Sequence, residues 1–279
     1  MNTSLPEFAP IEPPPAPAGW TAVRTEDGSW TMAAPGHGQA CHSTAGAWRE
    51  ARERYALATG LDLLAAERGH RQPVRLLDVG TGLGWNLAAA WDLVAAGEGQ
   101  LDATGLELEP ELCRAAPGIA TASGTGPWSA HYPVLAERLA ELASHGLPRS
   151  RTTLAPGSTL ELHLGDARST VSQLRAEGVR FDVIFLDAFS PSVEPDLWGG
   201  SFLGDLASLL EPTGMLSTYT VSLTVRERLR RAGLQVGTGP RVGAKAGGTL
   251  ASPTLDLPAL EPRAAAKLER RLSRPPEGA

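Results

Sequence analysis

The sequence has little cysteine. Its 279 residues include two, Cys41 and Cys113, which are too few for a disulfide framework or a cysteine-ligated zinc site. No stretch reaches the roughly 18 apolar residues that a membrane helix needs, and the N-terminus lacks a basic segment followed by an apolar one. We therefore expect a cytoplasmic protein that does not contact a membrane and holds no metal.

An excess of positive charge is also missing. The chain has 25 Lys and Arg against 31 Asp and Glu, a formal net charge of −6. This balance excludes a globally basic nucleic-acid binder but leaves room for a local basic face. Hydrophobic residues make up 42% of the chain, enough to bury the core of one large α/β domain or two small ones.

Proline gathers at the two ends of the chain. Residues 1–20 contain six prolines and few apolar side chains, which predicts a disordered lead. Residues 255–279 combine prolines with several cations, and we expect a flexible basic tail that can form a short helix. The tail is either simply solvated or a grip on a phosphate backbone.

Between these ends, over residues 21–254, apolar runs alternate with helical segments. The pattern predicts an α/β fold with a mostly parallel, seven-stranded sheet and helices on both faces. The expected strands are 74–78, 103–107, 160–164, 181–186, 215–220, 234–238 and 249–252. Residues 118–158 break this rhythm, and we interpret them as an insertion between the second and third strands.

A glycine-rich turn follows the first expected strand. Glycines here let a ligand approach the backbone, and the amides at the start of the next helix point toward it. A dinucleotide site would place its third glycine at position 85, but the sequence has Trp85, so an NAD-dependent oxidoreductase is the least favoured interpretation. The turn instead resembles motif I of S-adenosylmethionine (SAM) methyltransferases. Its candidate cofactor residues are Asp78, Gly80, Gly82, Gly84 and Asn86.

Acidic residues also follow the next two expected strands. Glu107 could accept hydrogen bonds from both ribose hydroxyls of a cofactor. Asp166, followed by Ala167, could accept from an adenine amino group. Each acid alone is more often a helix cap or a solvated charge. Together with Asp78 they mark the carboxyl edge of the sheet, where open α/β sheets bind ligands.

The segment 185–198 is more specific than the glycine-rich turn. It reads Phe-Leu-Asp-Ala-Phe-Ser-Pro-Ser-Val-Glu-Pro-Asp-Leu-Trp and is similar to the signature of the MnmC-type tRNA methyltransferases. The similarity continues through residues 209–220 and 225–234. An upstream segment, 42–47 followed by Glu50, also resembles the family, so the resemblance covers about residues 25–252.

The resemblance implies a class I, Rossmann-like methyltransferase that uses SAM to methylate the aminomethyl nitrogen of 5-aminomethyl-(2-thio)uridine at the tRNA wobble position. Many members are fused to a FAD-dependent oxidase. Because about 27 residues follow the last expected strand, we expect the stand-alone methyltransferase form, needing neither FAD nor a metal. A monomer with tRNA as its partner is the corresponding expectation.

Two departures from the family keep other substrates open. Val193 and Glu194 stand where the family has Lys-Asn, and residues 243–248 have lost two arginines of the family pattern Gly-Arg-Lys-Arg-Glu-Met. The alternatives are therefore a SAM-dependent methyltransferase of a non-tRNA substrate, or a non-catalytic SAM-binding protein. If tRNA is bound, a local face between Arg226 and Lys245 and the tail would have to grip it.

Methyl transfer needs an unprotonated nucleophile aligned with the cofactor. Asp187, at the end of the fourth expected strand, is the candidate catalytic residue: it could orient the acceptor nitrogen and take its proton, or only hold the SAM amino group. Stacking against the target base is expected of Phe189, Pro191 and Trp198, although Trp198 could equally pack inside the loop. His42 could touch substrate or be structural.

Overall fold

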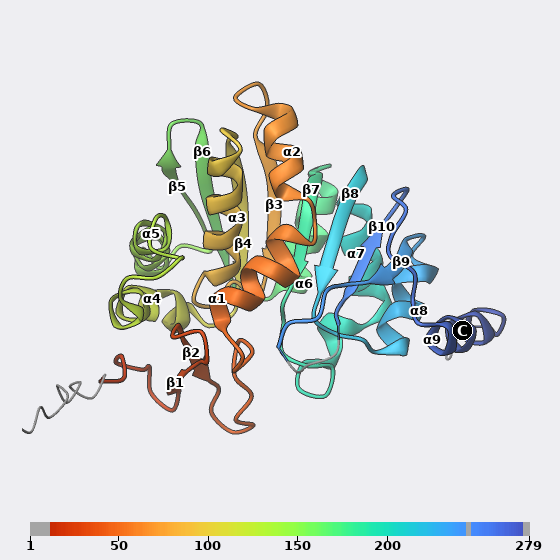
Figure 1. Cartoon of the computed structure of the whole chain (residues 1–279), viewed down its shortest axis with the longest axis horizontal. Helices are drawn as coiled ribbons and strands as arrows, with labels where there is room; N and C mark the ends of the chain where they lie inside the picture. Colours follow the sequence, from red (N-terminus) through yellow and green to blue (C-terminus); the bar gives the residue numbers. More distant parts are fainter. Residues whose placement is uncertain (1–11, 244–246, 276–279) are drawn as a thin grey trace, which may run out of the picture.

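An eight-stranded sheet forms the centre of the computed structural model, which describes residues 12–243 and 247–275 (Figure 1). In spatial order, its strands are β5 (Arg149–Ala155), β6 (Ser158–Leu164), β4 (Leu101–Glu107), β3 (Val74–Val79), β7 (Phe181–Leu186), β8 (Leu210–Thr218), β10 (Thr249–Ser252) and β9 (Gln235–Thr238). The five strands from β6 to β8 run parallel, whereas β5 and β10 are antiparallel to their neighbours. The predicted mostly parallel α/β sheet is confirmed.

The predicted number of seven sheet strands is wrong by one. The additional strand is β5, which lies within residues 118–158 and pairs with β6 through registers such as Arg151 with Glu161. None of its residues is fully buried. Exposed and half-buried residues alternate along it, but Ser150 and Thr152 on the half-buried face are polar, so the sequence has no apolar alternation that indicates a strand.

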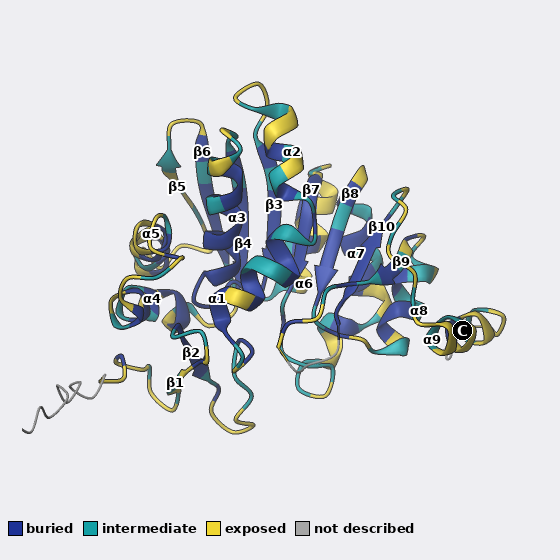
Figure 2. Cartoon of the chain, in the orientation of Figure 1, coloured by how far each residue is buried: buried dark blue, intermediate teal, exposed yellow. Residues whose placement is uncertain are grey.

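Helices cover both faces of the sheet. One layer holds α1 (Ala47–Glu50), the π-helix η1 (Ala51–Leu57), α2 (Leu61–Arg68), α3 (Trp85–Ala96), α4 (Pro110–Ser123) and α5 (Tyr132–Ser144). The opposite layer holds α6 (Ala167–Ala176), α7 (Gly200–Ser208) and α8 (Leu223–Arg231). On β3, Leu76 packs into the first layer and Leu77 into the second, as the alternation of a strand requires. The dark strands in Figure 2 are this doubly covered core.

A short hairpin precedes the helices. Its strands, β1 (Thr21–Arg24) and β2 (Trp30–Ala33), pair antiparallel, and Met32 is fully buried. Within the part of the predicted lead that the structure describes, residues 12–20, Pro14 is buried. Residues 1–11 of the predicted lead lie outside the described residues. The ordered end of the lead thus packs on the domain.

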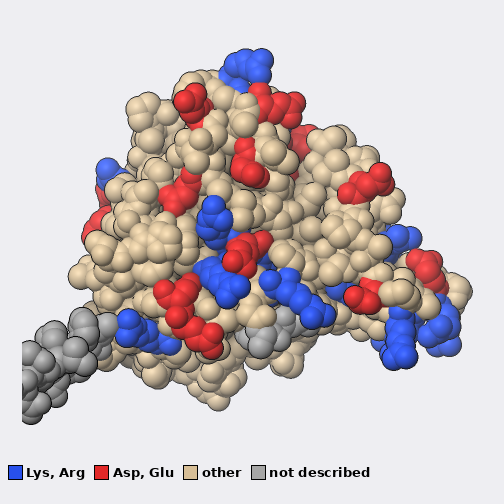
Figure 3. Space-filling view, viewed as in Figure 1, with Lys and Arg blue, Asp and Glu red and all other residues tan. Residues whose placement is uncertain are grey.

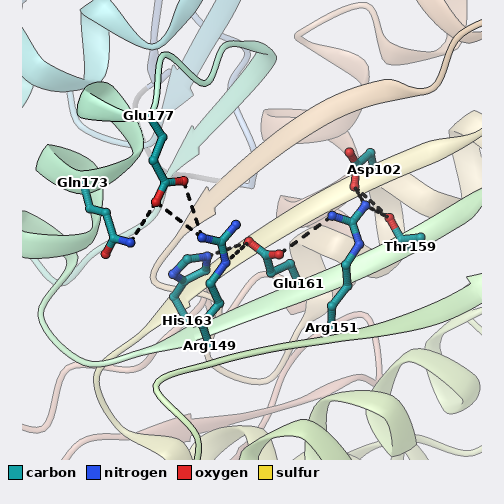
Figure 4. A network of polar contacts seen from close by, with 8 residues as sticks. All are labelled: Asp102, Arg149, Arg151, Thr159, Glu161, His163, Gln173 and Glu177. Atoms are coloured by element: carbon teal, nitrogen blue, oxygen red, sulfur yellow. Dashed lines mark hydrogen bonds and ion pairs between the residues drawn. The ribbon is translucent and has the colours of Figure 1, made fainter.

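The outer edge of the sheet carries a network of paired charges (Figure 4). Glu161 on β6 is bound by Arg149 Nε at 3.0 Å and by His163 Nε2 at 2.8 Å. Next to it, Arg151 Nη2 lies 2.8 Å from Asp102 Oδ1.

Among the described residues, no helix combines the length and apolarity needed to cross a membrane.

Candidate functional site

A cavity of about 790 Å³ lies at the carboxyl ends of β3, β4, β6 and β7. Residues 34–43, which follow the hairpin, form another wall, and α1 and η1 contribute the side chains of Glu50 and Arg54. Parallel strands that end together leave such a crevice where their connections diverge. Three of the acidic residues expected at this edge, Glu107, Asp166 and Asp187, therefore line one cavity, whereas Asp78 does not.

The backbone of the glycine-rich turn forms part of the cavity wall. Gly80, Gly82 and Gly84 have φ angles of 86°, 52° and 81°, a left-handed conformation that favours glycine. A Cβ on Gly80 would lie 2.8 Å from the carbonyl oxygen of Asp187. Gly80 and Gly82 line the cavity, whereas Gly84 faces the α5 side chains.

The tryptophan after this turn points away from the ligand side. Trp85 is fully buried, stacks on Tyr132 with ring centroids 3.7 Å apart, and donates from Nε1 to the carbonyl oxygen of Trp30 at 3.0 Å. The position where a dinucleotide site has glycine is thus filled by a core side chain.

Glu107 binds the glycine-rich turn with its carboxylate. Its Oε2 accepts from the N–H of Gly82 at 2.6 Å, and its Oε1 accepts from the N–H of Glu109 at 2.8 Å. Glu107 lines the cavity, and burial raises its pKa to about 7. Each carboxylate oxygen can accept more than one hydrogen bond, so ribose hydroxyls remain compatible partners.

Asp166 and Ala167 line the cavity at the start of α6. Asp166 Oδ1 accepts from the N–H of Arg168 at 2.9 Å, which makes it the cap of the helix. The Arg168 guanidinium also binds Asp166, with Nη2 2.7 Å from Oδ2, and this contact lowers the carboxyl pKa. The structure shows the capping role that the sequence left as an alternative.

Asp187 follows β7 and lies at the wall of the same cavity. Tyr55 Oη donates to its Oδ1 at 2.5 Å, and Asn86 Nδ2 donates to its Oδ2 at 2.8 Å. Burial, followed by the nearby charge of Glu50, raises the Asp187 pKa well above its ordinary value. A carboxylate whose pKa is raised has a higher affinity for a proton, and the two donors hold it in place, so it is suited to accept a proton.

Tyr55 was not predicted to belong to the site. It comes from the π-helix η1, a helix type frequent at functional sites, and lies 132 residues before Asp187. Its neighbour Arg54 forms a buried ion pair with Glu50, with Nε 3.2 Å from Oε1. Glu50 was noticed through the family resemblance, but no local pattern indicated the contact of Tyr55.

Asp78 lies beneath the turn and is fully buried. Among the described residues, neither of its carboxylate oxygens has a hydrogen-bond partner, and Asn86 Oδ1 also lacks one. Burial raises the Asp78 pKa to about 7. Asn86 and Thr81 lie close enough to oppose this rise, so Asp78 is a buried carboxyl that supports the turn and does not line the cavity.

Two of the four expected substrate residues reach the cavity. Phe189 lines it, with its ring 6.3 Å from Trp20 and 4.9 Å from His37 between centroids. His42 also lines it and shares a 2.9 Å hydrogen bond between Nδ1 and Thr31 Oγ1. Burial lowers the His42 pKa to about 4, so this imidazole is neutral at physiological pH.

Trp198 and Pro191 do not line the cavity. Trp198, in the 3₁₀ helix η2 (Pro195–Trp198), is fully buried and donates from Nε1 to the carbonyl oxygen of Phe189 at 2.7 Å. A stacking role for Trp198 is therefore wrong, because its ring is inside the core and holds the loop that carries Phe189. Pro191 is half-buried in this loop.

Most arginines of the basic face expected on α8 form contacts within the protein. Arg226 is buried and donates to Thr249 Oγ1 at 2.9 Å. Arg228 Nη1 donates to the carbonyl oxygen of Trp198 at 2.7 Å, and Arg231 pairs with Glu227 at 2.9 Å. These three arginines organise the fold instead of facing a partner, and Lys245 lies outside the described residues.

Comparisons with known proteins agree with this geometry. A sequence family described as S-adenosyl-L-methionine-dependent methyltransferase matches residues 136–254. The tRNA 5-methylaminomethyl-2-thiouridine biosynthesis bifunctional proteins MnmC of Aromatoleum aromaticum and of an Azoarcus species are 30% and 33% identical to this chain, each over 79% of it. The chain spans 33% of the length of each of these relatives.

The structure is also similar to the crystal structure of MnmC2 from Aquifex aeolicus. The TM-score is 0.73 at 29% sequence identity, and the match covers 93% of this chain and 78% of the other. This chain belongs to the MnmC-like family of SAM-dependent methyltransferases.

Proposed function

We propose that this enzyme transfers the methyl group of SAM to the aminomethyl nitrogen of 5-aminomethyl-(2-thio)uridine at the tRNA wobble position. The observation that carries the proposal is the Asp187 carboxylate, held by Tyr55 and Asn86 at the wall of the cavity. The named activity of the MnmC relatives supports the choice of acceptor.

The residues present fit SAM on two grounds. The first is steric, because glycine at position 80 lets a ligand approach backbone that a Cβ would push against Asp187. The second is electrostatic, because Asp78, Glu107 and Asp187 all have pKa values raised by burial. SAM carries a sulfonium and an ammonium group, and positive charge stabilises such carboxylates in their ionised form.

Each part of the cofactor has a matching wall. We assign the methionine end to Gly80, Gly82 and the Asp187–Asn86 pair, with Asp78 beneath and Gly84 shaping the turn. The ribose hydroxyls are assigned to Glu107. The adenine edge is assigned to the start of α6, where Asp166 and Ala167 line the cavity.

Bound SAM supplies an electrophilic methyl group. The acceptor amine arrives as an ammonium ion, and Asp187 accepts its proton, which frees the nitrogen lone pair. The freed nitrogen would then take the methyl group of SAM, and the electron pair of the broken carbon–sulfur bond would remain on sulfur. Phe189, packed between Trp20 and His37, offers an aromatic face for the uracil ring.

The test is nucleoside mass spectrometry of total tRNA from a strain of the source organism that lacks this gene. The proposal predicts accumulation of the 5-aminomethyl nucleoside and loss of its methylated product, with both reversed by the wild-type gene. An unchanged nucleoside profile would contradict it.

A second candidate is methylation of a non-tRNA amine. Val193 and Glu194 line the cavity, and the Glu194 carboxylate accepts from the N–H of Phe189 at 2.9 Å. An anion here disfavours phosphate and favours a small cationic acceptor. Transfer of labelled methyl groups from SAM to extracted small amines, with none to undermodified tRNA, would select this candidate.

A further inference from the structure

Residues 255–279 were expected to form a flexible tail, but their described part, residues 255–275, packs against the domain. Helix α9 (Pro262–Leu272) packs against α8 and buries Leu268, which is 2% exposed. Ahead of it, the carbonyl oxygen of Pro258 accepts from the N–H of Thr238 on β9 at 2.8 Å. The chain leading into α9 is thus tied to the edge of the sheet.

The end of α9 is also held in place. Arg231 Nη2 on α8 donates to the carbonyl oxygens of Arg271 and Arg274 at 3.0 and 2.8 Å. Donors at a helix C-terminus satisfy carbonyls that have no partner within the helix. Arg271 Nη1 in turn donates to Thr224 Oγ1 at 2.9 Å. Both ends of α9 are therefore fixed to the domain.

Three exposed cations of this helix and one just beyond its end form what we call the α9 stripe: Arg263, Lys267, Arg270 and Arg274. The first three are spaced four and three residues apart along one face of α9, and Arg274 follows two residues after the helix ends. All four are exposed, and within residues 12–243 and 247–275 none of them forms an ion pair. Figure 3 shows Lys and Arg gathered at the α9 end of the molecule.

The α9 stripe stands out against the rest of the chain. The whole protein carries a net charge of −6, and the arginines of α8 are used within the fold. Of the acidic residues next to the stripe, Glu269 faces Arg230 at 3.9 Å, and Glu261 precedes the first turn of α9; the four cations outnumber these two acids. A rigid row of uncompensated cations matches the charge of a phosphate backbone.

We propose that the α9 stripe docks the phosphate backbone of the tRNA substrate while the wobble nucleotide enters the cavity. The proposal rests on the function proposed above. In Figure 1, α9 lies beside the β9 edge of the sheet, at the opposite end from β5 and level with the carboxyl ends of the strands. The α9 stripe therefore lies at the same end of the sheet as the cavity that the substrate enters.

The test measures tRNA binding by the full-length protein as a function of salt, without turnover. Two double variants, R263Q/K267Q and R270Q/R274Q, each remove two charges. The matched control R71Q/R180Q removes two exposed arginines that precede β3 and β7, at the amino ends of the strands. We expect each stripe variant to weaken tRNA binding on the order of tenfold and to reduce the salt slope by about 2. The control should match wild type.

Further measurements separate the possible failures. SAM affinity and kcat should stay at wild-type values while KM for tRNA rises, because the stripe lies outside the cavity. Stripe variants that bind tRNA as wild type does would overturn the proposal, and so would stripe-dependent pelleting with phosphatidylserine vesicles at unchanged tRNA affinity. If wild type binds tRNA but does not methylate it, the proposed reaction fails and the docking result still stands.

Discussion

The cavity and the β5–β6 edge both gather carboxylates, yet the two regions treat them in opposite ways. At the edge, Glu161 is bound by Arg149 and His163, and the hydrogen bond from His163 lowers its pKa (Figure 4). At the cavity, burial raises the pKa values of Asp78 and Glu107 to about 7. At the edge, arginine and histidine side chains balance the charge of the carboxylates. Around the cavity, the protein provides few positive charges to balance them. Such a difference is expected between a structural network and a ligand site.

The largest expected effect is on catalysis by D187N. Asn keeps the size of the side chain but cannot accept the proton of the acceptor amine. We expect kcat for methyl transfer to fall on the order of 10²- to 10⁴-fold, measured as methyl incorporation into undermodified tRNA. E161Q, which alters a carboxylate of the edge network, should keep wild-type kcat. Wild-type turnover by D187N would remove Asp187 from the mechanism.

A methyl group on the glycine-rich turn should damage the cofactor site. G80A combines a left-handed φ of 86° with a Cβ only 2.8 Å from the Asp187 carbonyl oxygen. G178A is the matched control, because Gly178 has φ 70° and nothing within 4 Å of its Cβ position. Both substitutions should cost about 1–2 kcal/mol of stability from backbone strain. Calorimetry should show SAM affinity reduced on the order of tenfold or more in G80A alone.

Removing the Tyr55 hydroxyl should shift the pH dependence of the reaction. Its hydrogen bond lowers the Asp187 pKa, so Y55F should raise that pKa further and move the acidic limb of the kcat profile to higher pH. At neutral pH the rate should fall on the order of tenfold, as expected for a lost bond to a charged group. Y219F is the control, since Tyr219 lines the same cavity but donates to the carbonyl oxygen of Ala188. Equal profiles for the two variants would refute the assignment.

The buried carboxylates should make the ligand-free protein less stable as pH rises. Asp78 keeps its proton in the folded state up to about pH 7, whereas the unfolded chain releases it near pH 3.8. The stabilisation is complete below the unfolded value and falls by about 1.4 kcal/mol per pH unit between the two values. Urea unfolding from pH 4.5 to 6.5 should show that D78N loses this part of the decline. A D78N slope equal to that of wild type would contradict the burial argument.

The smallest effect is expected at the edge, and it has the opposite sign. The Glu161 pKa is lowered in the folded state, so its stabilisation is present above the unfolded value of 4.5 and is lost as pH falls. E161Q should therefore cost about 1 kcal/mol at pH 7 and less at pH 3. A larger loss at low pH than at pH 7 would show that the network does not work through its charges.

Much of the architecture could be predicted because its signals are local. The expected strand at 181–186 and the glycine-rich turn have apolar runs and glycine spacings that local sterics dictate, and the structure has both. β5 could not be predicted, since the half-buried face of this edge strand carries the polar Ser150 and Thr152 and gives no apolar period. Tyr55 was missed because its partner is 132 residues away. The sequence left Trp198 open between stacking and packing, because a signature motif does not distinguish a side chain that lines a site from one that supports it.

The measurement that most directly tests the central claim is calorimetry of SAM binding near pH 6.5 in buffers of different ionisation enthalpy. If the carboxylates of raised pKa in and beneath the cavity help to hold a cationic cofactor, SAM binding should release protons from Asp78 and Glu107, because positive charge lowers their pKa values. The release should shrink in D78N and be unchanged in E161Q. Binding without proton release, or no binding of SAM, would contradict the account.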